Sequence, residues 1–128
     1  MNKPFKPEGY NSVSPYFIVA GARQLADLLI QVFNASEKRR FDRPDGSIMH
    51  MEMQLDDSII MMGEASEQYP PNTLIMHVYV PDVEGTFKKA IQAGCESVEE
   101  PKRREGDPDF RGTFKDFAGN MWSIGTQE

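Results

Sequence analysis

Cysteine is almost absent from this sequence of 128 residues, which contains only Cys95. A single thiol excludes an internal disulfide and a thiolate cluster for zinc, and both absences are typical of a reducing compartment. No apolar run approaches the roughly 20 residues that a membrane-spanning helix needs, and no apolar stretch follows the lysines near the N-terminus. We therefore expect a soluble cytoplasmic protein without a membrane partner, in which Cys95 is a small apolar filler.

Positive charge is also scarce. The sequence has 14 Lys and Arg against 20 Asp and Glu, and its net charge of −6 repels a phosphate backbone. The basic residues form only two short groups, 38–40 and 102–104, beside carboxylates or proline, where solvated strand edges and loops are expected. A Gly-rich phosphate loop, a nucleophile elbow and a Ser-His-Asp spacing are absent as well. Nucleic acid is therefore not an expected partner.

The length and the ordinary globular composition predict one domain over residues 1–128, built from two similar halves. The first half, about 10–66, begins with a strand over 13–19. A helix follows, because apolar residues recur at helical spacing: Leu25, Leu28, Leu29, Val32 and Phe33. Strands are then predicted over 37–41, 48–55 and 58–62, separated by turns at 43–46 and 56–57.

The second half, about 73–126, repeats this plan after a proline-rich linker at about 67–72. A strand over 74–80 precedes a helix that begins at 81–82 and ends at Gly94. Its apolar face comprises Val83, Phe87, Ala90 and Ile91. Strands over 97–99, 110–115 and 121–125 follow, with a turn at 116–120. Since neither half can bury its helix alone, we expect both to share one continuous sheet in an α+β fold.

Strand alternation places His50 and Glu52 on one face, with Ile48 and Gln54. The opposite face is expected to pack against a helix and comprises Met49, Met51, Met53 and Leu55. His77 and Tyr79 likewise share a face with Ile75.

If both polar faces line one pocket, His50, Glu52 and His77 can converge, and three interpretations are open. They can form a metal site, or an imidazole oriented by Glu52 or Tyr79 can move a proton on a substrate. In the third, the histidines only form hydrogen bonds that give a pocket its shape and specificity.

The order of elements and several short motifs resemble a known family. The motifs are Asp-Phe-Ala-Gly-Asn-Met-Trp-Ser at 116–123, Pro-Glu-Gly-Tyr at 7–10, Ser-Pro-Tyr at 14–16, Asp-Gly-Ser-Ile-Met-His at 45–50, Asp-Ser-Ile-Ile-Met at 57–61 and His-Val-Tyr-Val at 77–80. From about Pro7 to Thr126 the chain resembles the vicinal oxygen chelate superfamily of glyoxalase I, bleomycin-resistance proteins and extradiol dioxygenases, in its PhnB-like branch. The resemblance implies two βαβββ modules that form a half-open barrel, usually in a homodimer.

Metal-using members of that superfamily take His or Glu ligands from the first and last strands of each module. The resemblance places these positions at Ser14, His77, about Met61, and Ser123. Only His77 is a conventional ligand, whereas a metal site needs at least three donors and a thioether is too soft for the usual hard ions. We therefore expect no metal and no other cofactor, with a divalent metal as the alternative.

The resemblance also places Tyr16 and Tyr79 around the barrel, where aromatic walls suit a planar or cationic guest. Arg111 can clamp a carboxylate or phosphate, or form a surface ion pair with Asp109 or Glu105. The resemblance places Trp122 on a barrel strand as well, where a core position against a helix is favoured over a place in the pocket. The residues expected to contact a ligand are Ser14, Tyr16, Met61, Tyr79, Arg111 and Ser123.

The predicted function is binding of a small molecule, as in glyoxalase and bleomycin-resistance proteins. The alternative is an enzyme, either a metal-dependent lyase, isomerase or dioxygenase, or a metal-free acid–base catalyst that uses His50, Glu52 and His77. A structural or regulatory dimer with a vestigial pocket is a third hypothesis.

Overall fold

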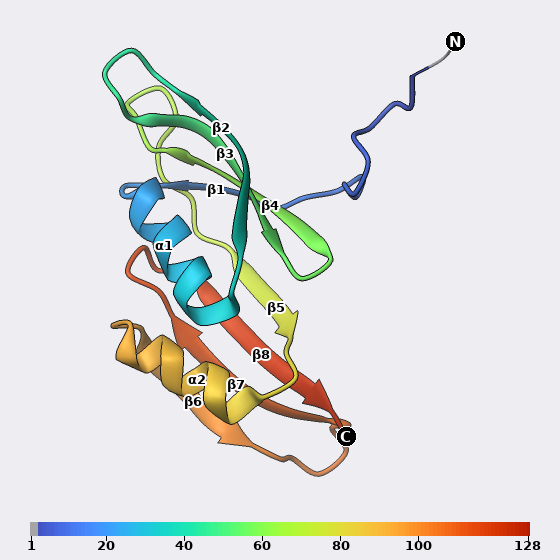
Figure 1. Ribbon diagram of the computed structural model, residues 1–128. Coiled ribbons are helices and arrows are strands. Elements are labelled where there is room, and N and C mark those ends of the chain that lie inside the picture. Colours follow the sequence, from blue (N-terminus) through green and yellow to red (C-terminus); the bar gives the residue numbers. More distant parts are fainter. Residues whose placement is uncertain (1–2) are drawn as a thin grey trace. The chain divides into compact units, whose positions relative to one another are not determined.

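The computed structural model describes residues 3–128 and contains two helices and eight strands within them (Figure 1). The first half comprises β1 (Tyr16–Val19), α1 (Ala22–Phe33), β2 (Ser36–Asp42), β3 (Ile48–Leu55) and β4 (Ser58–Glu64). The second comprises β5 (Ile75–Tyr79), α2 (Val83–Gln92), β6 (Glu96–Lys102), β7 (Asp109–Lys115) and β8 (Met121–Gln127). The predicted α+β class and the two βαβββ modules are confirmed.

Each half forms its own mixed sheet of four strands. The strand orders are β1-β4-β3-β2 and β5-β8-β7-β6, and in both sheets the first strand of the half pairs in parallel with the last. Within residues 3–128 no ladder joins the two sheets, so the expectation of one continuous sheet is wrong. Instead, β1 and β5 each pair in parallel with the last strand of their own half, and each is the edge strand of its own sheet.

The chain divides into two compact units, residues 3–30 with 34–71 and residues 31–33 with 72–128. They correspond to the two predicted modules, except that the last turn of α1 groups with the second unit. That the chain forms a single domain stays a prediction.

Helix α1 begins without a capping side chain of its own. Its N-cap is Gly21, whose φ of 111° is readily adopted only by glycine. The carboxylate of Glu64, at the end of β4, instead accepts hydrogen bonds of 2.9 Å from the backbone N–H groups of Gly21 and Ala22. A negative charge at a helix N-terminus also interacts favourably with the helix dipole. The predicted apolar stripe is buried at Leu25, Leu28, Leu29 and Val32.

Helix α2 begins where the sequence predicts. The side chain of Asp82 accepts a hydrogen bond of 3.0 Å from the Gly85 N–H, and Gly94 follows the helix with a φ of 99°. Three of the four predicted apolar residues are buried, whereas Ile91 is 39% exposed. The buried stripe of α2 is therefore narrower than the sequence pattern suggests.

The core of the second unit contains a polar cluster at the turn between β7 and β8. Asp116 accepts hydrogen bonds from the Trp122 indole N–H at 2.9 Å and from the Asn120 side-chain amide at 3.1 Å. Trp122 and Asn120 are fully buried, and the Phe33 ring centroid lies 5.4 Å from that of Trp122. The predicted core position of Trp122 is confirmed.

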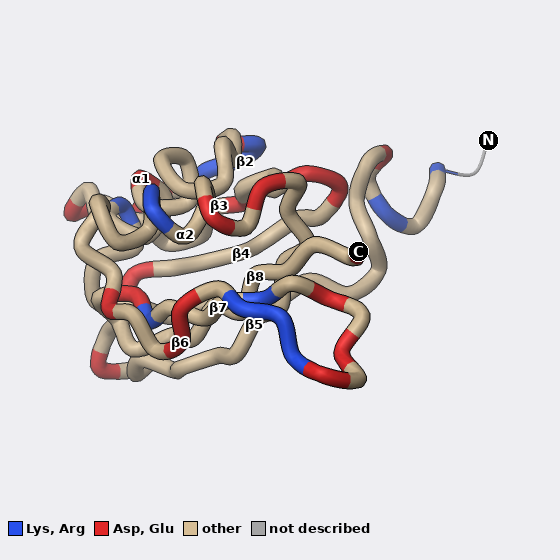
Figure 2. Tube along the Cα trace, turned by 90° about the horizontal axis from the view of Figure 1, so that it is seen from below, with Lys and Arg blue, Asp and Glu red and all other residues tan. Residues whose placement is uncertain are grey.

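Acidic and basic residues are interspersed along the chain trace (Figure 2). The two basic groups face carboxylates: Arg40 lies 3.3 Å from Asp42, and Arg103 lies 2.6 Å from Glu128. Such pairing fits the expected solvated strand edges and loops. Neither helix within residues 3–128 has the length and apolar character needed to cross a membrane.

Candidate functional site

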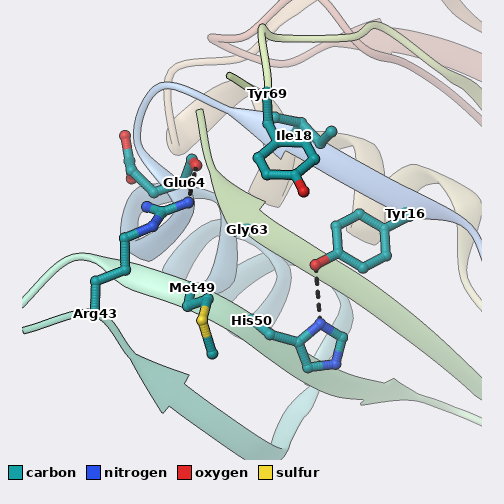
Figure 3. A pocket seen from close by; sticks show the side chains of 8 residues that line it. All are labelled: Tyr16, Ile18, Arg43, Met49, His50, Gly63, Glu64 and Tyr69. Carbon is teal, nitrogen blue, oxygen red and sulfur yellow. Dashed lines mark hydrogen bonds between the residues drawn. The ribbon is translucent and has the colours of Figure 1, made fainter. Parts of the chain in front are cut away.

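The first unit contains a cavity of about 460 Å³, within the range typical of small-molecule sites (Figure 3). Strands β1, β3 and β4, the turn after β2 and the loop after β4 all contribute to it. The lining residues are Tyr16, Ile18, Arg43, Met49, His50, Gly63, Glu64 and Tyr69. Four of them bear aromatic rings or a guanidinium, and the others give apolar surface or backbone.

A β-bulge in β3 gives this cavity one wall. Phe41 pairs with His50, but the next residue of β2, Asp42, pairs with Ile48, so Met49 is an extra residue in β3. A bulge breaks strand alternation. Met49 and His50 therefore both line the cavity, while Ile48 is buried. The predicted grouping of Ile48 with His50, and of Met49 with the helix-facing methionines, is wrong for this reason. Met51 and Met53 are buried as predicted.

Gly63 forms the floor of the cavity beside the bulge. A Cβ atom at this position would lie 2.7 Å from the carbonyl oxygen of Met49 and 3.4 Å from the Tyr16 hydroxyl. The first of these atoms belongs to backbone and cannot turn away as a side chain would. Gly63 therefore permits the close approach on which the cavity depends.

A chain of hydrogen bonds runs from the cavity into the protein. The Tyr16 hydroxyl lies 2.9 Å from His50 Nδ1, and His50 Nε2 lies 2.8 Å from Glu52 Oε2. The other oxygen of Glu52 accepts a hydrogen bond of 2.5 Å from the Tyr10 hydroxyl, and Arg39 lies 3.7 Å away. Alternation predicts that His50 and Glu52 share a face, but Tyr10 and Tyr16 were not expected to join them.

The environment of Glu52 determines the direction of these hydrogen bonds. Burial alone would raise the pKa of Glu52, but hydrogen bonds from Tyr10 and His50, with the charges of His50 and Arg39, hold this pKa below its usual value. Glu52 is therefore an ionised acceptor, so His50 Nε2 carries a proton. In neutral imidazole Nδ1 then accepts, and the Tyr16 hydroxyl donates to it.

Tyr16 itself is held in its protonated form. Burial raises the pKa of its hydroxyl, the charge of Arg43 lowers it, and the negative charge of Glu52 raises it again, with a net rise. The hydroxyl proton points at His50, so the side of the cavity at Tyr16 presents a neutral phenol.

Arg43 supplies positive charge elsewhere in the same cavity. Its guanidinium donates hydrogen bonds of 3.1 Å to the Ser47 hydroxyl and to the backbone carbonyl of Glu64. No carboxylate in residues 3–128 lies within 4.0 Å of it, because the Glu64 carboxylate is turned to the N-terminus of α1. Figure 3 shows Arg43 and His50 on separate sides of the cavity, with Met49 between them. Sequence reasoning missed Arg43, whose only signal was its place in a turn.

The predicted site residues of the second unit include a cluster on β5 and β8, which Asp109 of β7 joins. His77 Nδ1 lies 3.0 Å from the Ser123 hydroxyl, and its ring stacks edge-on against Tyr79, with centroids 4.8 Å apart. The Tyr79 hydroxyl donates to Asp109 at 2.8 Å. His77 and Tyr79 are exposed.

Arg111 forms an ion pair, as one of the two interpretations predicts, but with another partner. Its Nε lies 2.8 Å from Asp107, not beside Asp109 or Glu105. Asp109 instead accepts a hydrogen bond from the Tyr79 hydroxyl.

Ladder register corrects one predicted correspondence between the modules. Tyr16 pairs with Met61 as His77 pairs with Ser123, so the counterpart of His77 is Tyr16 and not Ser14. Ser14 precedes β1, and its buried hydroxyl has no hydrogen-bond partner in the described chain.

These four positions thus offer phenol, thioether, imidazole and hydroxyl groups. The set does not fit the three or more His or Glu donors of a divalent site. No group of three or more His, Cys, Asp or Glu residues suited to a metal occurs between residues 3 and 128.

Comparison with known families decides where this chain belongs. The model of the Glyoxalase/Bleomycin resistance protein/Dioxygenase superfamily matches residues 16–124. The chain belongs to this superfamily. An uncharacterized protein of Mycobacterium bovis is 26% identical over 125 residues, which is 89% of this chain and 82% of that protein. A second, of Mycobacterium tuberculosis, is also 26% identical and is covered to 73%.

Solved structures of low identity share the fold of this superfamily member. TioX from Micromonospora sp. ML1 has a TM-score of 0.72 at 20% identity, over 91% of this chain and 96% of its own. TnmS3, an antibiotic binding protein from Streptomyces sp. CB03234, has a TM-score of 0.69 at 15% identity, over 92% and 98%. The fosfomycin resistance protein FosX from Listeria monocytogenes has a TM-score of 0.67 at 14% identity, over 92% and 93%. At these identities the likeness shows the fold alone.

Proposed function

We propose that this superfamily member binds a small organic molecule in the first-unit cavity, without the usual metal. The observation that carries the proposal is the cavity itself. It offers the guanidinium of Arg43, which has no carboxylate partner among residues 3–128, the phenol ring of Tyr16, and apolar or aromatic walls between them. Pockets of this size with few polar groups at fixed positions are typical binding sites.

The chemistry of the walls indicates the class of ligand. The rings of Tyr16 and Tyr69 and the thioether of Met49 favour a planar, largely apolar molecule. Arg43 favours a carboxylate, phosphonate or carbonyl oxygen on one side of that molecule. TnmS3, an antibiotic binding protein, shares this fold, which supports the binding of a small molecule here by analogy only.

A thermal-shift screen of planar aromatic acids, each at saturating concentration, tests the proposal. A ligand at about a hundred times its Kd stabilises the folded state by about 2.7 kcal/mol. Arg43→Gln should abolish the shift for the best acid. The matched control is Arg23→Gln on α1, whose side chain lies 4.0 Å from Asp27 and is not part of the cavity wall described above. A screen that yields no stabilising compound, or equal binding by Arg43→Gln, would refute the proposal.

Several finer expectations stay predictions: the PhnB-like branch, a homodimer and a cytoplasmic location. So do ligand contacts from Ser14, Met61, Tyr79, Arg111 and Ser123, none of which lines the first-unit cavity. Sedimentation equilibrium of the full chain tests the homodimer, which predicts twice the chain mass of 14.5 kDa.

A further inference from the structure

The chain before β1 lies mostly in solvent. Residues 3–15 form neither a helix nor a strand, and in Figure 1 they run from the start of β1 away from the sheet of the first unit. Residues 3–9 and 11–13 are exposed, whereas Tyr10 between them is partly buried. Tyr10 is therefore the sheltered point of an otherwise exposed stretch.

Tyr10 fastens this stretch to the network behind the cavity wall. Its hydroxyl donates to Glu52 Oε1 at 2.5 Å, and the neighbouring Asn11 side chain accepts a hydrogen bond of 3.3 Å from the Ile59 N–H. Burial, together with the hydrogen bond to Glu52 and the negative charge of Glu52, raises the pKa of Tyr10, so the hydroxyl keeps its proton. Because Glu52 is ionised, this hydrogen bond is charge-assisted and roughly twice as strong as a neutral one.

Glu52 divides its two oxygens between the N-terminal stretch and the cavity. Oε1 accepts from Tyr10, while Oε2 lies 2.8 Å from Nε2 of His50, whose side chain lines the cavity. The carboxylate is planar and only 5% exposed, so a rotation that loses Tyr10 also shifts the oxygen that holds His50. Two hydrogen bonds thus connect the N-terminal stretch to a residue of the cavity wall.

We infer that residues 3–13 form a strap that Tyr10 fastens to Glu52, and that fastening of the strap and ligand binding in the first-unit cavity strengthen each other. The inference rests on the proposed function, because it describes the regulation of that same cavity. With the strap fastened, Glu52 holds His50 in the orientation that a ligand meets. By reciprocity, a ligand that packs against this wall tightens the strap by the same factor.

Arg39 gives the carboxylate a partner when the strap is released. Its Nε lies 3.7 Å from Glu52 Oε1, and its guanidinium lies over the Tyr10 ring, 5.3 Å from the ring centroid. When Tyr10 leaves, this guanidinium is beside the vacated oxygen, so the buried charge of Glu52 stays paired. Closer pairing with Arg39 weakens the attraction between Glu52 and His50. The fastened and released states therefore differ in the group that holds one carboxylate oxygen.

Limited digestion of the full chain with chymotrypsin measures the strap directly, because this protease cleaves after aromatic residues. Phe5 is 90% exposed and is the internal reference, whereas the fully buried Phe17 is cleaved only after global unfolding. We expect the wild type to be cut after Tyr10 about tenfold more slowly than after Phe5, since cleavage follows the population in which the strap is released. Cleavage after Phe17 should be slower still.

Tyr10→Phe removes only the hydroxyl and keeps a ring after which chymotrypsin cleaves. This variant should be cut after residue 10 about tenfold faster than the wild type, with cleavage after Phe5 unchanged. The matched control is Ser12→Ala, which removes another hydroxyl of the strap, one that accepts a hydrogen bond of 3.1 Å from Lys6. This control should change neither rate. Far-UV circular dichroism checks that each variant is folded.

The fluorescent aromatic acid 2-naphthoate tests the coupling to the cavity. At saturation it should slow wild-type cleavage after Tyr10 about fivefold, the low end of typical coupling factors, without slowing cleavage after Phe5. A fluorescence titration should show that Tyr10→Phe binds 2-naphthoate less tightly, by up to the same factor, while Ser12→Ala binds it as the wild type does. If only another acid of the thermal-shift screen binds, that acid replaces 2-naphthoate.

The outcomes distinguish the strap from the binding function. Equal wild-type cleavage after Phe5 and Tyr10, or an unchanged rate in Tyr10→Phe, overturns the strap while leaving the binding function standing. If the acid binds but changes neither the cleavage after Tyr10 nor its affinity in Tyr10→Phe, the coupling is overturned. If no acid binds, the proposed function fails and the coupling with it, while digestion without ligand still decides whether Tyr10 fastens the strap.

Discussion

Replacement of Asp116 by alanine should destabilise the second unit more than any surface substitution. The carboxylate is 5% exposed and accepts from the Trp122 indole at 2.9 Å, from the Asn120 side chain at 3.1 Å, and from the backbone N–H groups of Ala118 and Asn120 at 2.9 and 3.0 Å. Asp116→Ala leaves the donors of two fully buried side chains without an acceptor. Each unsatisfied buried donor costs about 1–3 kcal/mol.

Two such donors and a weakened turn together cost about 4 kcal/mol, which corresponds to a fall of about 12 °C in Tm for a chain of this size. Asp116→Asn keeps one acceptor oxygen but points an N–H₂ group at other donors. We therefore expect its free energy of unfolding to fall by about 2 kcal/mol. Asp57→Ala, in an exposed turn, is the control and should change stability by less than about 0.5 kcal/mol.

The assay is urea unfolding followed by fluorescence. Trp122 is the only tryptophan in the sequence and is fully buried, so its emission reports the second unit directly. A loss below about 1 kcal/mol in Asp116→Ala would show that the indole and amide donors find other acceptors, and would refute the reasoning.

Two further predictions concern the first unit. Gly63→Ala should cost about 1–3 kcal/mol and weaken ligand binding, since its Cβ meets backbone 2.7 Å away. Gly125→Ala, the counterpart in the second module, should cost less, because the atoms nearest to its Cβ belong to the Arg111 and His77 side chains, at 3.3 Å or more, and equal losses in urea unfolding would contradict this account. The lowered pKa of Glu52 means that its ionised form stabilises the fold above the unfolded-state pKa, and that this contribution is lost as pH falls through the folded-state pKa. The urea midpoint of the wild type should therefore exceed that of Glu52→Gln at neutral pH and approach it in acid, and a constant gap would contradict the predicted ionisation.

Local pattern was enough to predict the elements of both modules. The helical spacing of Leu25, Leu28 and Leu29 survives as a buried stripe, and the cap at Asp82 lies where the sequence places it. These features depend on residues within a few positions of one another. The number of sheets does not depend on neighbouring residues alone, because it is set by the strands with which β1 and β5 pair.

The candidate site was only half predictable for the same reason. Alternation puts His50 and Glu52 together, since both belong to one strand. Tyr10 precedes its partner Glu52 by 42 residues, and Tyr16 precedes its partner His50 by 34 residues. No local pattern encodes such contacts. Arg43 enters the cavity through a turn whose conformation the sequence does not display.

The bulge at Met49 makes the wall of the cavity sensitive to the loss of a single residue from β3. Substitution changes one side chain, but removal of Met49 would restore the alternation of β3, with Ile48 and His50 as neighbours on opposite faces, and would take the Met49 wall away from the cavity. Deletion of a single codon at this position can therefore remove a ligand-facing wall of the first module while the paired strands beyond it keep their register. Natural variation in chain length at the start of β3 would then indicate which members of the superfamily recognise different guests.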